Sequence, residues 1–216
     1  MVGKYSLQLL TGEDKIMNWR GSVYQQLPSP ALHHCKAMAI FNPVTIFREP
    51  KWEVIEKFDL HKFSLVVLDK FTPMEVQCII NPTYQEAMRW IYKMDIENQP
   101  ISVDIEISHN ETACVGLSNK VDVGMCINFR TNTGNHYTLQ EEKQIRKALF
   151  KLFTKPTVQL VFQNGSFDTT WQGYKDRAPL IKPYFDTLLA HHTLYPRLPH
   201  NLGFLTSVYT NHPNVS

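Results

Sequence analysis

The clearest pattern along the chain is a strict alternation of apolar and polar residues at positions 101–108. Four aliphatic residues alternate there with four polar ones, in the order Ile101, Ser102, Val103, Asp104, Ile105, Glu106, Ile107 and Ser108. Side chains of a strand alternate between its two faces, so this pattern predicts a half-buried β-strand. Asp104 and Glu106 therefore leave the same face, about 7 Å apart along the strand.

Regular elements are predicted on both sides of this strand. Further strands are expected at residues 75–80, 113–118, 121–129 and 157–162, and helices at residues 84–93, 138–153, 165–174 and 184–194. The three consecutive strands from residue 101 have short connections, which favour antiparallel pairing, and the continuous apolar run at 157–162 is typical of a strand covered on both faces. The order predicts an α/β fold with a mixed sheet flanked by helices.

The first seventy residues have a different character, because proline residues break their apolar runs. Residues 52–63 show helical spacing, and residues 64–68 have the composition of a strand. A change in composition predicts a linker around residues 69–73. The sequence thus divides into a segment of residues 1–70 and a domain of residues 71–216.

Length and composition limit the classes of function. With 216 residues and a formal net charge of +2, the chain is long enough for one domain and part of another, and any phosphate contact must come from a local groove. The four cysteines show no C-x-x-C spacing, which favours a reducing setting. A membrane-spanning helix needs about 18 consecutive apolar residues, and no apolar run here approaches that length. The N-terminus lacks the continuous apolar stretch of a signal peptide. We therefore expect a soluble, cytoplasmic protein without a membrane partner.

The pair Asp104 and Glu106 is not explained by stability, because two carboxylates on one face repel each other. A divalent cation such as Mg²⁺ takes oxygen ligands and would relieve this repulsion. The alternative is a solvated strand face without chemistry.

A second acidic position follows the strand predicted at residues 157–162. If a helix begins at Asn164, that residue can cap it, and Asp168 lies one turn later on the same face. Asp168 would then project from the end of a central strand, the usual place for a site in an open α/β sheet. Asp186 opens the next predicted helix, and we expect it to cap that helix rather than to bind a metal.

These residues carry a resemblance to a known family. Val103-Asp-Ile-Glu106 and Gln163-Asn-Gly-Ser-Phe-Asp168 resemble the first two motifs of the proofreading 3′–5′ exonuclease domain of DNA polymerases, which has the RNase H-like fold. The segment from Phe185 to Leu205 is similar to the region after the second motif in phage-type, family A-like polymerases. The resemblance covers residues 75–216.

The resemblance implies a two-metal mechanism at the 3′ end of single-stranded DNA. It assigns catalysis and the binding of two Mg²⁺ or Mn²⁺ ions to Asp104, Glu106 and Asp168. It assigns substrate binding to Asn164, Ile107 and Phe167, the last two by apolar contact with the terminal base or sugar.

The last motif of the family, a Tyr or His followed four residues later by an Asp, has no match. Tyr209 has Pro213 at that offset, and no acid follows Asp186. We therefore expect an exonuclease domain that is truncated before its last motif, that is weak or inactive by itself, and whose polymerase domain is missing from this chain.

A second resemblance covers residues 5–70. Trp19-Arg20-Gly21-Ser22 and the segment around Pro43 resemble the C-terminal part of uracil-DNA glycosylases, although Asn42 stands where that family usually carries a His. The resemblance implies a partial glycosylase-like α/β segment without glycosylase chemistry. The tandem of the two resemblances suggests a phage-type replicative polymerase, acting in a phage-infected or bacterial cell.

Two other functions remain open. The chain is a non-catalytic nucleic-acid-binding fragment if the missing fourth acid is essential. It is an RNA-directed exonuclease of the same fold if its site accepts a 2′-hydroxyl, which the sequence does not indicate.

Overall fold

The computed structural model describes residues 1–211, which form two compact units. The first unit comprises residues 1–75 and 191–211, and the second comprises residues 76–190. The chain passes from the second unit to the first within α8 (Thr187–Leu194). The division of the sequence at residue 70 stays a prediction. Pro213, which stands where the family carries the acid of its last motif, lies outside the described residues.

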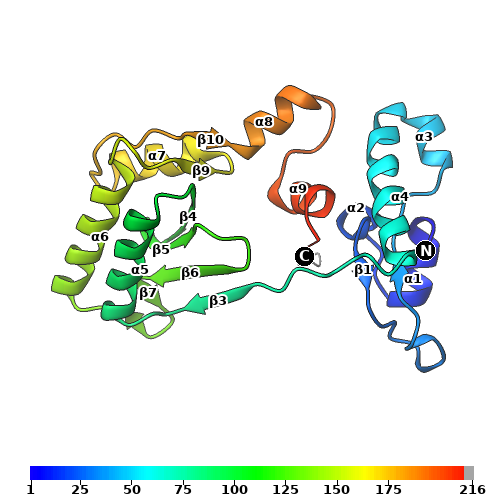
Figure 1. The fold of residues 1–216 in the computed structure, drawn as a ribbon, viewed down its shortest axis with the longest axis horizontal. Coiled ribbons are helices and arrows are strands. Elements are labelled where there is room, and N and C mark those ends of the chain that lie inside the picture. The colour runs from blue at the N-terminus through cyan, green and yellow to red at the C-terminus, as the bar shows by residue number, and fades with distance from the viewer. Residues whose placement is uncertain (212–216) are drawn as a thin grey trace. The chain divides into compact units, whose positions relative to one another are not determined.

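A six-stranded mixed sheet forms the centre of the second unit (Figure 1), with the strand order β10-β9-β4-β5-β6-β3. The strands are β3 (Gln77–Ile80), β4 (Ile101–Ser108), β5 (Glu111–Ser118), β6 (Val123–Asn128), β9 (Leu160–Phe162) and β10 (Phe185–Asp186). β4, β5 and β6 are antiparallel, whereas β9 runs parallel to both β4 and β10, and β3 runs parallel to β6. A short hairpin, β7 (Arg130–Thr131) and β8 (Gly134–Asn135), follows β6.

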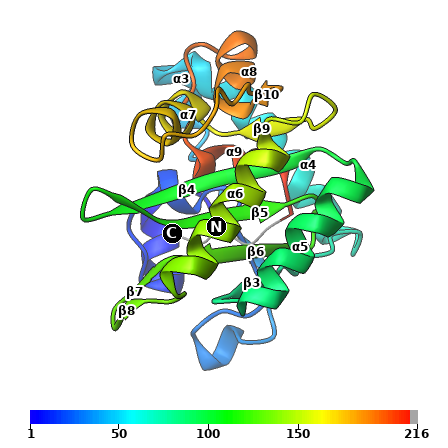
Figure 2. The ribbon, with the colours of Figure 1, turned by 90° about the vertical axis from the view of Figure 1, so that its left-hand side faces the viewer.

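Two helices, α5 (Tyr84–Glu97) and α6 (Leu139–Phe153), lie over one face of this sheet (Figure 2). Each begins with a capping box, in which a Thr side chain accepts a backbone N–H and a Glu three residues later accepts the N–H of that Thr. The helices and strands bury one apolar core, which includes Ile91, Ile145, Val103 and Ile105. Because side chains alternate along β4, this packing leaves Asp104 and Glu106 exposed on the other face.

The first unit is mainly helical. Its elements are α1 (Gly3–Thr11), α2 (Ile16–Trp19), β1 (Val23–Tyr24), the 3₁₀ turns at Pro30–Leu32 and Pro50–Trp52, β2 (Ala37–Met38), α3 (Val44–Arg48), α4 (Glu53–Val67) and α9 (Leu202–Tyr209). Trp52, Ile55, Phe204 and Leu205 belong to its apolar core. None of the helices within residues 1–211 is long and apolar enough to span a membrane.

The predicted α/β fold with a mixed sheet flanked by helices is confirmed. The prediction of a strand at residues 64–68 is wrong, because α4 continues to Val67 and ends near Asp69, whose φ is 56°. Each residue added to an existing helix gains a hydrogen bond without a new nucleation cost, and this outweighs the weak β preference of Val66 and Val67. The glycosylase-like character of residues 5–70 stays a prediction.

Candidate active site

The acidic strand β4 has an open edge beside its carboxylates. β9 pairs with β4 only at Ile101 and Ser102. The N–H of Ile101 points toward β9, where it donates to the carbonyl of Gln159 at 2.9 Å, so the N–H of Ile105 points to the same edge beyond the end of β9. The Oδ1 atom of Asp168 accepts the N–H of Ile105 at 3.1 Å. Asp168, only 4% exposed, therefore meets β4 between Asp104 and Glu106.

A tight connection from β9 places Asp168 there. Asn164 has a left-handed backbone conformation, with φ 63°, and α7 (Gly165–Tyr174) begins at the next residue. A Cβ atom on Gly165 would lie 2.5 Å from the Cβ of Phe162, a distance that real contacts do not reach. A glycine is therefore required for α7 to start so close to β9, one turn before Asp168.

Asp186 joins the starts of two helices. Its Oδ1 atom accepts the N–H groups of Leu188 at 2.9 Å and Leu189 at 3.3 Å, which confirms the prediction that it caps α8. It also caps α7, because its Oδ2 accepts the N–H of Gly165 at 2.8 Å and its Oδ1 accepts that of Asn164 at 3.2 Å. A carboxylate at a helix N-terminus satisfies free N–H groups and complements the helix dipole.

The prediction that Asn164 caps α7 with its side chain is wrong, because that side chain makes no capping hydrogen bond. Asp186 takes the role instead. Its second role was missed because residues 184–186 were assigned to a helix, whereas Phe185 and Asp186 form β10 and pair with Val161 and Phe162 of β9. Parallel pairing brings the carboxyl ends of β9 and β10 to one edge, and with it Asp186 to the start of α7.

The carboxylates of the site repel one another. Partial burial of its carboxyl group and, second, the negative charge of Glu106 raise the pKa of Asp104. Burial raises the pKa of Asp168 to about 6. The hydrogen bond from the N–H of Ile105 lowers this pKa, whereas the negative charges of Asp104 and Asp186 raise it further. Perturbed carboxyl groups of this kind are common at functional sites, and a cation would relieve their repulsion.

The donor chemistry of the site fits a hard divalent cation, because Asp104, Glu106 and Asp168 all offer carboxylate oxygens. Within the described part of the chain, however, no three or more His, Cys, Asp or Glu side chains form a ready-made metal site. The three acids are therefore neighbours around Ile105, and their assignment as metal ligands stays a prediction.

The three residues predicted to bind substrate lie on β4 and around the start of α7. Asn164 is exposed, and Phe167 is 52% exposed on the outer side of α7. Ile107 is half-buried, next to a register shift between β4 and β5 that follows Glu106. The structure leaves Asn164 and Phe167 accessible, and the substrate contacts stay predictions.

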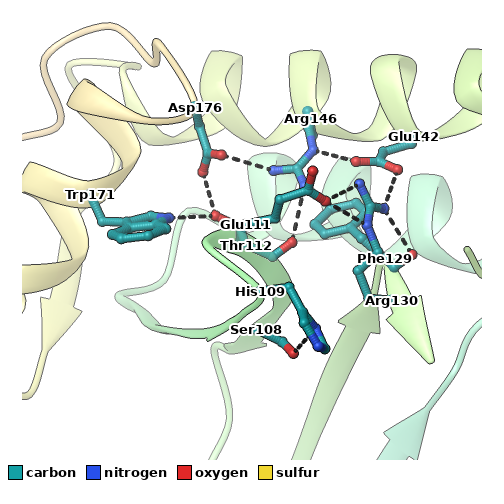
Figure 3. A network of polar contacts seen from close by, with 10 residues as sticks. All are labelled: Ser108, His109, Glu111, Thr112, Phe129, Arg130, Glu142, Arg146, Trp171 and Asp176. Carbon is teal, nitrogen blue, oxygen red and sulfur yellow. Dashed lines mark hydrogen bonds and ion pairs between the residues drawn. The ribbon is translucent and has the colours of Figure 1, made fainter. Parts of the chain in front are cut away.

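A polar network, not foreseen in the sequence, fixes the C-terminal part of α7 (Figure 3). The hydroxyl of Thr112, in β5, accepts the indole N–H of Trp171 at 3.0 Å and donates to Asp176 at 2.7 Å. Asp176 also pairs with Arg146 of α6 at 3.5 Å, and Arg146 donates to Glu142 at 2.9 Å. The network links α7, which carries Asp168, to both β5 and α6. Apart from the i,i+4 pair of Glu142 and Arg146, no spacing along the sequence signals the network, because its partners come from three separate segments.

Comparison with known proteins identifies the family. The family model described as 3′–5′ exonuclease matches residues 79–216, more than half of the chain. No curated protein matches the sequence.

Three solved structures illustrate the structural similarity. The catalytic core of RRP6 from Trypanosoma brucei is 16% identical, with a TM-score of 0.46 over 64% of this chain and 37% of that chain. Escherichia coli RNase D, an exoribonuclease involved in structured RNA processing, is 17% identical. Its TM-score is 0.42 over 65% of this chain and 34% of that chain. Brucella melitensis NrnC with bound Mg²⁺ is 17% identical. Its TM-score is 0.39 over 63% of this chain and 61% of that chain.

The chain spans less than two thirds of the length of each of these three neighbours. The family match covers the acidic strand, α7 and the segment after it. The chain thus belongs to the 3′–5′ exonuclease family, and its mixed sheet flanked by helices is the RNase H-like fold expected for that family.

Proposed function

We propose that this chain removes nucleotides from the 3′ end of a single-stranded nucleic acid by hydrolysis, with Asp104, Glu106 and Asp168 as the catalytic acids. The observation that carries the proposal is the hydrogen bond between Asp168 and the N–H of Ile105. It brings an acid from α7 to the point of β4 that lies between the other two acids.

The chain's own residues contribute position and charge. Asp104 and Glu106 extend from a strand inside the sheet, and α7 is held at its start by Asp186 and near its end by the Thr112 network. Asp104, Glu106 and Asp168 would hold Mg²⁺ or Mn²⁺. Such ions, when bound, lower the pKa of a water molecule and stabilise charge on the leaving oxygen. Asn164 and Phe167 are accessible for contacts with the terminal nucleotide.

The motif resemblance favours single-stranded DNA and a proofreading role beside a DNA polymerase. An RNA-directed exonuclease of the same fold is the second candidate. The proposed acids act on the phosphodiester group, and none of them is assigned a contact with the 2′-hydroxyl, by which a protein distinguishes RNA from DNA.

The test is the degradation of 5′-labelled single-stranded DNA and RNA of one sequence, with Mg²⁺ or Mn²⁺. We expect a ladder that shortens from the 3′ end and that is lost in Asp104→Asn, because the variant lacks a carboxylate that would hold the metal ions. The matched control is Asp122→Asn, which removes the same charge at an exposed position of the β5–β6 turn. The relative rates on DNA and RNA decide between the two substrates.

Two outcomes would contradict the proposal. One is a ladder of equal rate in the wild type and in Asp104→Asn. The other is binding of the strand in EDTA without any product under either metal, which would support the non-catalytic fragment.

A further inference from the structure

The outer face of α7 carries an exposed group of aromatic side chains. Phe167, Trp171, Tyr174 and Lys175 follow one another at helical spacing, so they lie on one side of the helix. Together with Ser166 and Thr170 they line an open hollow of about 520 Å³. Phe167 is 52% exposed and Tyr174 is 79% exposed. We call this set of six residues the α7 platform.

The rings of the platform are arranged in advance of any ligand. The rings of Phe167 and Trp171 are stacked, with centroids 6.3 Å apart and planes inclined by 28°. The indole of Trp171 is fixed by its hydrogen bond to Thr112, which Figure 3 shows together with the ion pair of Asp176 and Arg146. The Nζ atom of Lys175 lies 5.6 Å from the ring centroids of both Trp171 and Tyr174.

Lys175 is the one charged side chain of the α7 platform. The two carboxylates of the segment turn inward, because Asp168 binds the N–H of Ile105 and Asp176 binds Thr112 and Arg146. Lys175 and two hydroxyl groups therefore accompany the aromatic rings on the accessible side. Aromatic faces beside a cation suit a single-stranded nucleic acid, whose bases stack on the rings while its phosphates meet the positive charge.

We propose that the α7 platform continues the contact of Phe167 with the terminal nucleotide: Trp171, Tyr174 and Lys175 bind unpaired nucleotides of a single-stranded nucleic acid, on the 5′ side of the nucleotide that is hydrolysed. The inference rests on the proposed function, because the inner side of the same helix carries Asp168. One helix then contacts the strand twice: its inner side lies at the scissile bond, and its outer side lies at the bases on the 5′ side of that bond. Stacking of this kind is tolerant of sequence, as the removal of any terminal nucleotide requires.

The test is the affinity of the full chain for fluorescently labelled oligo-dT and oligo-rU, measured by anisotropy in EDTA so that no hydrolysis occurs. Loss of one stacking ring is worth a factor of about 5 to 150 in the dissociation constant, so we expect Tyr174→Ala to bind at least about fivefold more weakly. Lys175→Ala should weaken binding and reduce its dependence on salt. The matched control is Tyr92→Ala, which removes a similarly exposed tyrosine from α5.

A second readout reports contact directly. Bound bases should quench tryptophan fluorescence, and Trp171→Phe should lose most of this quenching while it retains a ring on the platform. Circular dichroism checks that each variant is folded.

The proposal is overturned if Tyr174→Ala and Tyr92→Ala bind equally well, if the wild type does not bind either oligonucleotide, or if poly-glutamate binds in their place. Its failure is distinguishable from that of the proposed function, because binding in EDTA is independent of hydrolysis. Normal trimming with equal affinities would reject only the platform. Platform-dependent binding, with trimming unaffected by Asp104→Asn, would reject only the assignment of the acids.

Discussion

The carboxylate of Asp168 accepts the backbone N–H of Ile105 at 3.1 Å, in the place that a longer β9 would occupy with a carbonyl oxygen. One side chain thus completes the hydrogen bonding of β4 and brings a third acid to the strand that carries Asp104 and Glu106. The structural and the proposed chemical role of Asp168 can be separated, because an amide retains an acceptor oxygen but loses the charge.

We therefore expect Asp168→Asn and Asp168→Ala to differ in stability but not in activity. Both should abolish 3′ trimming. Asp168→Ala should also lower the free energy of unfolding by about 1–3 kcal/mol, because it leaves the buried N–H of Ile105 without its acceptor. Asp168→Asn should stay close to the wild type. Urea denaturation beside the labelled-strand assay tests this, and an Asp168→Asn variant with full activity would contradict the catalytic role.

The start of α7 depends on a residue without a side chain. A Cβ atom at Gly165 would meet the Cβ and Cγ atoms of Phe162 at 2.5 and 2.6 Å, whereas a Cβ atom at Gly173 in the same helix meets nothing within 4 Å. We expect Gly165→Ala to cost about 1–3 kcal/mol of unfolding free energy by overpacking and to lower activity, because α7 must shift and take Asp168 with it. Gly173→Ala is the control and should be neutral or stabilising by up to about 1 kcal/mol. Equal stability of the two variants would show that α7 does not need this close approach.

The elements that sequence predicted well are those whose signal is local. The alternation in β4 lies within eight residues, and the strand is found in the structure where the pattern places it. The same-face position of Asp104 and Glu106 follows from the alternation alone. The strand predicted at residues 64–68 failed because its short apolar run also fits a helix that has already started.

The parts that sequence could not predict depend on where distant strands end. β9 stops at Phe162, which opens the edge of β4 to Asp168, and the pairing of β10 with β9 carries Asp186 to the start of α7. Trp171 meets Thr112 for a similar reason, since the two residues are joined only through the packing of α7 on the sheet. Long-range contacts of this kind leave no periodic trace in the sequence.

Asp186 offers a prediction about these distant contacts. Because it accepts N–H groups from the first turns of both α7 and α8, Asp186→Ala should cost more than an ordinary cap, about 2 kcal/mol or somewhat above. It should also reduce trimming, since α7 loses an anchor beside Asp168. Asp186→Asn keeps one acceptor oxygen and should lose less stability. A fully active and stable Asp186→Ala variant would show that the network of Thr112 suffices to hold α7.

The first unit contains a buried contact between two ionisable side chains, Arg20 and Asp59. The Nε atom of Arg20 donates to Asp59 at 3.1 Å, and both side chains are almost fully buried. Lys62, on the same helix as Asp59, donates to the carbonyl oxygens of Ser207 and Thr210 at the end of α9. Burial raises the pKa of Asp59 to about 7 although Arg20 opposes the shift, and burial lowers the pKa of Lys62 to about 8.

These shifts give the stability of the first unit a definite dependence on pH. Between about pH 4 and about pH 7 the folded state holds a proton on Asp59 that the unfolded state has lost, so the free energy of unfolding should fall as pH rises. Above about pH 8 the unfolded state holds a proton on Lys62 that the folded state has lost, so the free energy of unfolding should rise again with pH. Asp59→Asn should flatten the first slope, whereas Asp69→Asn, at an exposed carboxylate paired with Lys36, should leave it unchanged. Urea denaturation of the three proteins from about pH 4.5 to about pH 7 measures the slope. A wild-type stability that rises over this range would show that the attraction of Arg20 outweighs the burial of Asp59.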